Sequence, residues 1–276
     1  MAIFGRLLAV TLILALGALP LRAEAVRALS EALRIERLLD IMQAEGLRYG
    51  ADLEADMFPG SGGARWQAIL TRIHDRDRMS ERFHRRFAEA LDGQDEAVAA
   101  MVGFFASGPG RQFVELELAA REALLDEAVT EAAEVAFDDM LVARDPRVRL
   151  LRRFAEVNDL IDSNVSGALN SNLAFYMGLV EGGSHREQIP EADILADVWA
   201  QEPAIRVDTE DWLFPYLTLA YRPVSDADLE AYIAFCEMPE GRLLNAALFA
   251  GFDAMFRMLS HDLGHAAGQL MQGEDI

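Results

Sequence analysis

Apolar residues recur three and four positions apart along most of this chain, the spacing that places them on one face of an α-helix. The pattern is clearest in two stretches, Leu29, Leu33, Leu38 and Met42, and Leu150, Phe154, Val157 and Ile161. Nowhere does it alternate for long with the two-residue period of a strand. Val and Ile are sparse beside Ala, Leu, Glu and Arg, which are strong helix formers. The pattern therefore predicts an all-α fold, a multi-helix bundle.

Capping residues, prolines and glycines mark the expected helix boundaries. Asp145 precedes Pro146, which suits the first position of a helix, and Ser225 opens a segment that resembles a capping box. Pro215 lies inside an aromatic segment, where it must begin a helix or kink one. We expect helices at residues 27–56, 64–76, 80–91, 95–106, 109–143, 146–180, 190–200, 209–221, 226–237 and 240–271.

One segment of the chain occurs twice. Residues 101–111 (MVGFFASGPGR) align without gaps with residues 232–242 (YIAFCEMPEGR), so that Phe104 matches Phe235, and Gly110 matches Gly241. Each copy follows an aromatic helix and precedes a long helix rich in Ala and Leu. The spacing is far longer than the repeat of a solenoid, so we interpret the chain as a duplicated helical domain. The two related halves are residues 26–144 and 145–276, after an N-terminal segment of residues 1–25.

The repeated segment has the features of an αα-hairpin corner. A short helix ends, the chain turns, and a glycine in the first turn of the next helix lets the preceding aromatic helix pack closely. The two arginines that follow either remain solvated or ion-paired at the corner, or line a shared groove. The residues of this structural motif are Phe104, Ser107, Gly110 and Arg111 in the first copy, and Phe235, Pro239, Gly241 and Arg242 in the second.

The two corners resemble the periplasmic domain-of-unknown-function 2059 family. Its hallmark is an aromatic pair, then Ser or Thr, Pro, any residue, Gly and a polar or basic residue at a helix corner. The first copy departs from it with Gly108 at the proline position, and the second with Cys236 and Met238 at the second aromatic and Ser positions. The resemblance covers about 50 residues around each corner. It implies secretion, an all-α fold and no established activity, and it supplies no catalytic residues.

The N-terminal segment has the pattern of a secretory signal peptide. Arg6 precedes an apolar run from Leu7 to Pro20, and Ala23-Glu24-Ala25 is a small-x-small cleavage site. The run is shorter than the roughly 20 apolar residues of a spanning helix, although a retained anchor is the alternative. We expect cleavage after Ala25, or after Ala23, which would place the mature chain in the periplasm without a stable membrane anchor.

The charge of the chain restricts its binding partners, and its cysteine content restricts its covalent bonds. The net charge of −21 opposes nucleic acid and anionic lipid headgroups, since both are bound through Lys and Arg. Cys236 is the one cysteine of the chain, so no internal disulfide forms. Its apolar neighbours indicate a buried small hydrophobe, and Glu237 beside it is the wrong charge for activating a nucleophile.

Two features could carry chemistry or binding. His261 and His265 are four residues apart, as zinc ligands on one helix face must be, but Asp262 stands where a zincin has its Glu and no third ligand is evident. We expect His74, His84 and His185 to be solvated. The helix predicted at 146–180 also carries a row of Asn and Ser, Asn158, Asn164, Ser166, Asn170, Ser171 and Asn172. This row either faces water or lines a polar seam where a ligand or helix docks.

No catalytic, cofactor or metal site is predicted, because the sequence has no nucleophile elbow, phosphate loop or dinucleotide fingerprint. We expect a non-enzymatic protein of the cell envelope that binds another envelope protein or a small apolar ligand, and not nucleic acid. The alternative is a metal-dependent hydrolase centred on His261 and His265. A purely structural role is the third option, and it would show as a closed surface with no groove.

Overall fold

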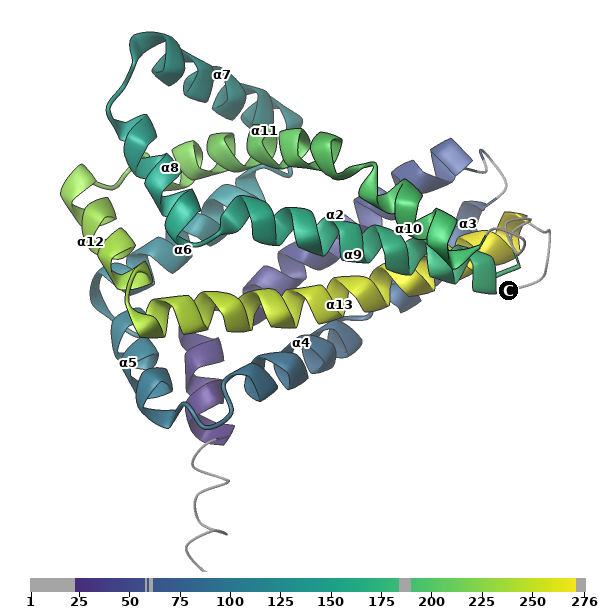
Figure 1. Cartoon of the computed structure of the whole chain (residues 1–276), viewed down its shortest axis with the longest axis horizontal. Coiled ribbons are helices and arrows are strands. Elements are labelled where there is room, and N and C mark those ends of the chain that lie inside the picture. The colour runs from purple at the N-terminus through teal and green to yellow at the C-terminus, as the bar shows by residue number, and fades with distance from the viewer. Residues whose placement is uncertain (1–22, 58, 60–61, 184–189, 272–276) are drawn as a thin grey trace, which may run out of the picture.

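The computed structural model describes residues 23–57, 59, 62–183 and 190–271. Within these ranges it consists of helices and contains no strand, so the all-α prediction is confirmed (Figure 1). Residues 23–32 are helical. The helices that follow are α2 (Ile35–Met57), α3 (Gly63–Ile73), α4 (Arg76–Ala90), α5 (Asp95–Phe105), α6 (Gly108–Ala123), α7 (Glu127–Ala143), α8 (Arg147–Val157), α9 (Leu160–Glu181), α10 (Glu191–Trp199), α11 (Glu202–Tyr221), α12 (Asp226–Cys236) and α13 (Pro239–Met271).

Three helices predicted as continuous are each interrupted. Arg34, with φ of 53°, separates residues 23–32 from α2, and Asp159, with φ of 49°, separates α8 from α9. Between α6 and α7, the side chain of Asp126 accepts a hydrogen bond from the backbone N–H of Ala128 and so starts a new helix. The apolar spacing continues across all three breaks, which is why periodicity alone predicts single helices there.

Pro215 lies in the interior of α11 and does not begin it. The helix starts at Glu202, seven residues before the predicted start at residue 209, with Pro203 in its first turn. Pro215 is buried. Because proline has no backbone N–H, the carbonyl of Asp211 lacks its usual helical donor. Asp211 is exposed, so water supplies a donor instead. The aromatic segment is therefore the C-terminal half of a longer helix.

Among the described helices, α9 and α13 form the closest pair. A Cβ atom added to Gly178 or Gly182 would collide with the carbonyl oxygen of His261 or His265 respectively. From the other side, a Cβ on Gly264 would collide with the carbonyl oxygen of Phe175. Gly178 meets His261, and Gly182, one turn later, meets His265, one turn later on the other helix. The two helices therefore run parallel, side by side (Figure 1). Glycine is required at this crossing, since any side chain would push the backbones apart.

Helix α13 runs through the centre of the bundle. It packs against α9 and α4 along its length, and against α3, α5 and α12 (Figure 1). Among the described helices it alone is long and apolar enough to cross a membrane, by length and composition. A central core helix has the same composition, because it contacts other helices on several sides. Its contacts within the bundle account for part of its apolar sequence, since a third of its most apolar stretch is buried.

The core joins both halves of the chain. One large cluster of buried side chains extends from Leu29 to Ala267, with aromatic rings at its centre. Phe113 stacks on Tyr232 at 4.1 Å between ring centroids, and Phe154 meets Tyr221 edge to face at 5.2 Å. A second, smaller cluster of Val165, Leu169, Ile194 and Val198 joins α9 to α10. The halves therefore share one core and do not form separate domains.

Candidate functional site

The two predicted corners lie against each other. The rings of Phe104 and Phe235 stack at 3.8 Å between centroids and 7° between planes, so equivalent residues of the two copies meet. At each corner the glycine is buried in the first turn of the second helix. A Cβ on Gly110 would collide with the carbonyl oxygen of Phe104, and one on Gly241 with that of Phe235. Both glycines thus occupy the close approach that the sequence suggested.

The remaining corner residues are structural or exposed. Ser107 is the N-cap residue of α6 but makes no side-chain cap hydrogen bond. Gly108 has φ of 62°, which proline cannot adopt, and this explains why the first corner has glycine where the second corner has Pro239. Pro239 is the first residue of α13. Arg111 and Arg242 are both exposed, and no side-chain hydrogen bond or ion pair of theirs occurs among the described residues.

An open cleft of about 920 Å³ lies beside α9 and α13, and we call it the central cleft. A second cavity, of about 1130 Å³, lies beside residues 23–37 and α4. One wall is the face of α13 that carries Leu244, Leu248, Phe249, Phe252 and Phe256. Another part of the lining is the N-terminal half of α9, whose lining residues are short or polar: Asp162, Ser163, Asn164, Ser166, Gly167, Ala168, Asn170 and Ser171. Side chains of α6, α11 and α12 close its inner end. Its lining therefore combines an apolar part and a polar part.

The row of Asn and Ser lies at the rim of this cleft and is mostly accessible to water. Asn164, Ser166 and Asn170 are exposed, and all three line the cleft. Asn170 donates a hydrogen bond to Asp253 on α13 at 2.8 Å. Asn158 differs, since it is buried and donates to the carbonyl oxygen of Phe154 at 2.9 Å. The row therefore mostly faces water, and three of its exposed members line the open cleft and not an interior seam.

Glu117 of α6 is the central polar group at the inner end of the cleft. The hydroxyl of Tyr221 donates to its carboxylate at 2.7 Å, and Tyr232 hydrogen-bonds the same group. The hydroxyl of Tyr216 donates to its backbone carbonyl at 3.3 Å. Burial raises the pKa of Glu117 to about 7, although the two tyrosine hydrogen bonds act in the opposite direction. The cleft thus ends at a carboxyl group that titrates near neutral pH.

Arg121 lies one helical turn beyond Glu117. Its guanidinium donates to both carboxylate oxygens of Glu45, at 2.9 and 2.8 Å, and lies 5.7 Å from the ring centroid of Trp212. A smaller cavity of about 150 Å³ continues inward from here, and it is lined mainly by apolar residues such as Leu118 and Val114. Since Glu45 already neutralises Arg121, this arginine is not a free anion-binding group.

Cys236 is buried below the cleft, as the sequence predicted. Burial raises the pKa of its thiol to about 12, against a hydrogen bond with Asn158 that lowers it. A thiol with so high a pKa is not a nucleophile at neutral pH. Its role is packing beside the stacked aromatic rings of the corners.

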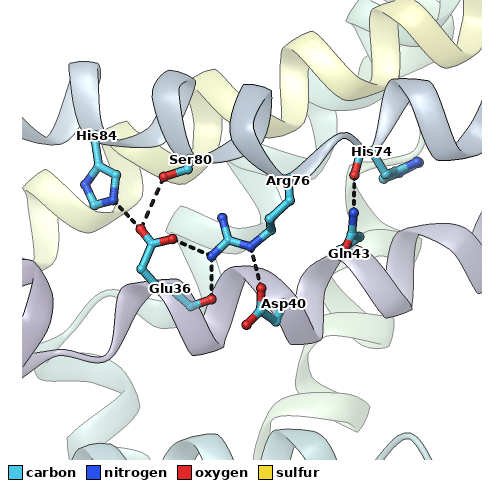
Figure 2. Close-up of polar contacts among 7 residues, drawn as sticks. All are labelled: Glu36, Asp40, Gln43, His74, Arg76, Ser80 and His84. Atoms are coloured by element: carbon cyan, nitrogen blue, oxygen red, sulfur yellow. Dashed lines mark hydrogen bonds and ion pairs between the residues drawn. The ribbon is translucent and has the colours of Figure 1, made fainter.

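A separate cluster of hydrogen bonds and ion pairs connects α4 to α2 (Figure 2). Arg76 donates to Asp40 at 2.5 Å and to the carboxylate of Glu36 at 2.7 Å. Ser80 and His84 both hydrogen-bond the same oxygen of Glu36, at 3.2 and 2.8 Å. Burial alone would raise the pKa of Glu36, but the His84 hydrogen bond and the charge of Arg76 outweigh it, so this pKa is lowered.

This cluster lacks the order of a catalytic triad. In a triad the histidine accepts the proton of the serine and the carboxylate holds the histidine. Figure 2 instead shows Ser80 and His84 pointing to one carboxylate, side by side on α4. The arrangement can bind two helices together, but it cannot activate Ser80.

In the alternative metal site, the ring of His261 and the carboxylate of Asp262 have other partners. The ring of His261 hydrogen-bonds Glu181 at 2.9 Å, and Asp262 accepts from Arg78 at 2.8 Å. Over the described residues, no group of three or more His, Cys, Asp or Glu side chains is arranged to hold a metal ion. The geometry therefore gives the metal-dependent alternative no support.

The prediction that His74 is solvated is wrong. His74 is buried, its Nδ1 lies 3.1 Å from the carbonyl oxygen of Leu70, and Gly46 of α2 packs directly against the ring. Burial lowers its pKa, although the hydrogen bond raises it. The charged residues next to it in sequence point elsewhere, and so they do not report its environment. His84 is half-buried against Glu36, and His185 lies outside the described residues.

Sequence reasoning missed Glu117 and its tyrosine partners. The signal was present, because Gly110, Phe113, Glu117 and Arg121 follow one another at helical spacing on the buried face of α6. An acidic residue in such a stripe indicates a buried carboxyl group with a dedicated partner. The partners Tyr221 and Tyr232 are about a hundred residues away in sequence, and only the fold shows that they meet it.

Comparison of the chain with protein-family models, with curated proteins and with solved structures finds no match. The site is therefore interpreted from its own geometry.

The corner glycines generate a prediction about stability. Gly110→Ala and Gly241→Ala should each lower the free energy of unfolding by about 1–3 kcal/mol, because the new methyl group meets a carbonyl oxygen. Gly103→Ala is the matched control on α5, where a Cβ meets nothing within 4 Å, and it should stabilise by roughly 0.5–1 kcal/mol. Urea unfolding of the three variants measures both signs. Stabilisation by all three would show that the corners are not packed.

Glu117 generates a prediction about pH. A carboxyl group whose pKa is raised on folding favours the folded state fully below about pH 4.5, and this contribution is lost as the pH rises through about 7. Glu117→Gln keeps hydrogen-bonding groups but cannot ionise. Relative to this variant, the wild-type protein should lose about 1–3 kcal/mol of unfolding free energy between pH 4.5 and 8.

Urea unfolding at several pH values measures the difference for Glu117→Gln. The exposed substitution Glu131→Gln on α7 is the control, and it should leave the pH dependence of the wild type unchanged. Parallel curves for wild type and Glu117→Gln would mean that the carboxyl group keeps its ordinary pKa.

Proposed function

We propose that this chain is an exported, non-enzymatic binding protein of the periplasm, and that the central cleft holds a small, largely apolar ligand. The signal-like segment and the resemblance of the corners to a periplasmic family support the location. We further propose that residues 26–144 and 145–276 arose by duplication. The stacking of Phe104 on Phe235 supports this, because it joins equivalent positions.

The observation that carries the binding proposal is the central cleft itself. Phe249, Phe252 and Phe256 lie half-buried along one face of α13, and they line an open volume of about 920 Å³. Ligand sites are typically concave, mostly apolar and supplied with a few polar groups, and the volume lies in their usual range of about 300–1,000 Å³. A purely structural bundle would instead present the closed surface described above.

No described arrangement supports catalysis at this site. Glu117 has the raised pKa of many general acids, but its partners are tyrosine hydroxyls and no serine, threonine or accessible thiol nucleophile lies beside it. The neighbouring thiol of Cys236 is buried and has a raised pKa. A binding role requires none of these groups to react.

A neutral fluorescent probe, N-phenyl-1-naphthylamine, tests the binding proposal. We expect its emission to increase with the wild-type protein, and Gly167→Leu to weaken binding by at least about tenfold, because the added side chain occupies the cleft. Gly167 lines the cleft, and a Cβ there meets nothing within 4 Å, so the variant should fold.

Gly103→Leu is the matched control for this experiment, since Gly103 is an exposed helical glycine with equally open surroundings outside the cleft. It should bind the probe like the wild type. Absence of binding to the wild-type protein, or equal binding by Gly167→Leu, would contradict the proposal. Circular dichroism of each variant verifies that the helices are intact.

Mass spectrometry of the periplasmic fraction tests export. We expect a mature chain that begins at Val26, or at Glu24 if cleavage follows Ala23. Replacing Ala23 and Ala25 by tyrosine should block cleavage, because the peptidase requires small residues there. A full-length wild-type chain held in the inner membrane would contradict periplasmic release.

A further inference from the structure

The charges of the central cleft restrict the ligand that it can hold. Four acidic side chains line the cleft, Glu117, Asp159, Asp162 and Asp253, against two cationic side chains, Arg86 and Arg121. Glu117, whose pKa is about 7, carries only part of a charge at neutral pH. The excess is therefore negative, in a chain whose net charge is −21. An anionic group entering the cleft would meet repulsion, while a cation would meet attraction.

Both cationic side chains of the lining are already paired. Arg121 donates to both oxygens of Glu45, and Arg86 forms an ion pair with Glu89 on its own helix. Binding a carboxylate or phosphate through either arginine would require breaking an existing ion pair. The cleft thus offers no free cation to an anionic headgroup among its described lining.

Two of its carboxylates, in contrast, are less closely paired: Asp159 has no ion pair among the described residues, and Asp253 has a long one with Arg257. Asp253 accepts a hydrogen bond from the neutral amide of Asn170 at 2.8 Å, and Arg257 approaches it only to 3.8 Å. Asp159 accepts from the hydroxyl of Ser163 at 3.0 Å. Asp162 differs, because Arg206 pairs with it at 2.6 Å. Asp253 and Asp159 therefore retain negative charge that a ligand can neutralise.

Asp253 carries its negative charge directly beside the apolar wall of the cleft. On α13 it is adjacent to Phe252, four residues after Phe249 and three before Phe256, so the carboxylate lies within a stripe of phenylalanines that line the cleft. Aromatic rings attract cations through their faces, and a carboxylate beside them adds a full charge. An apolar body with one positive group would contact both features at once.

We propose that the central cleft selects a cationic amphiphile, a small molecule with an apolar body and an amine or quaternary ammonium group that binds between Asp253 and the phenylalanines of α13. This inference rests on the proposed function, since it names the class of ligand for the same cleft. The apolar body covers Phe249, Phe252 and Phe256, and the charged group lies towards the polar wall of α9.

Three decyl compounds of equal chain length test the proposal on the intact mature protein: decyltrimethylammonium, decanol and decanoate. Each is added below its micellar concentration to displace N-phenyl-1-naphthylamine. We expect decyltrimethylammonium to bind at least about tenfold more tightly than decanoate, with decanol between them. The preference should shrink at high salt, because the carboxylates near the mouth are partly screened.

The variant Asp253→Asn tests whether Asp253 causes the preference for a cationic ligand. The asparagine retains a carbonyl oxygen that can accept from Asn170, so the fold should be kept, while the charge is removed. We expect the affinity for decyltrimethylammonium to fall about tenfold and that for decanol to be unchanged. Asp138→Asn is the matched control, since it removes one charge from the exposed surface of α7 and should alter neither affinity.

The outcomes separate the two proposals. If decanol displaces the probe and the cation binds no better than decanoate, the cation preference is wrong and the binding proposal stands. If the wild-type protein binds the probe and none of the three decyl compounds, the cationic amphiphile proposal is likewise overturned. A wild-type protein that binds neither probe nor decyl compounds contradicts both proposals. The wild-type comparison alone decides the preference, even if Asp253→Asn were to fold poorly.

Discussion

The parallel contact between α9 and α13 is the constraint on which the rest of the architecture depends. Backbone meets backbone at Gly178 and Gly264, so neither helix can rotate or shift without a collision. This fixes which face of α13 is left over. One side is used by α9 and another by α4. Phe249, Phe252 and Phe256 line the central cleft, and Phe252 also packs on Phe83 of α4 at 4.6 Å between ring centroids. Among the described residues of the first half, a glycine brings two helix backbones together only at the corner, where Gly110 meets the carbonyl of Phe104. In this half α2 and α6 are joined by side chains, through the ion pairs of Arg37 with Glu115 and of Arg121 with Glu45.

The two halves are therefore alike at their corners and differ beyond them. Helices α5 and α12 have the same length, and their corners meet through Phe104 and Phe235. Beyond the corners the chains diverge. Helix α13 continues for 33 residues, whereas the corresponding stretch of the first half stops at Ala123 and restarts at Glu127. As a result α7 packs on α11 and not beside α2, and the inner end of the cleft is closed by α6 and α11 with Glu117 between them. This arrangement is expected if a domain was duplicated and the long helix after the corner was then interrupted in the first copy.

The sequence predicts local features of this structure well and distant contacts poorly. Helical periodicity is a property of neighbouring residues, so the fold class, the corners and the burial of Cys236 follow from it. The breaks at Arg34 and Asp159 depend on single backbone conformations that leave the apolar spacing unchanged. The burial of His74 depends on Gly46 of another helix, and its own charged neighbours are misleading. The Asn and Ser row of α9 was recognised as unusual, but the phenylalanines that make it one wall of a cleft belong to a helix some eighty residues later.

The cleft persists because short side chains line it beside long ones without filling the space between them. On α9 the lining residues include Ser163, Ser166, Gly167 and Ala168, and on α13 they include phenylalanines. Larger apolar residues on α9 would cover those rings and remove water from them, gaining roughly 25 cal/mol for each Å² of apolar surface buried. Close packing is the usual state of protein interiors, so an open apolar wall lowers stability relative to a filled one. A ligand that covers the wall recovers this free energy in the bound state only, and linkage then makes the bound protein the more stable form. A cleft lined by half-buried phenylalanines thus suits the binding role proposed above better than a purely structural one.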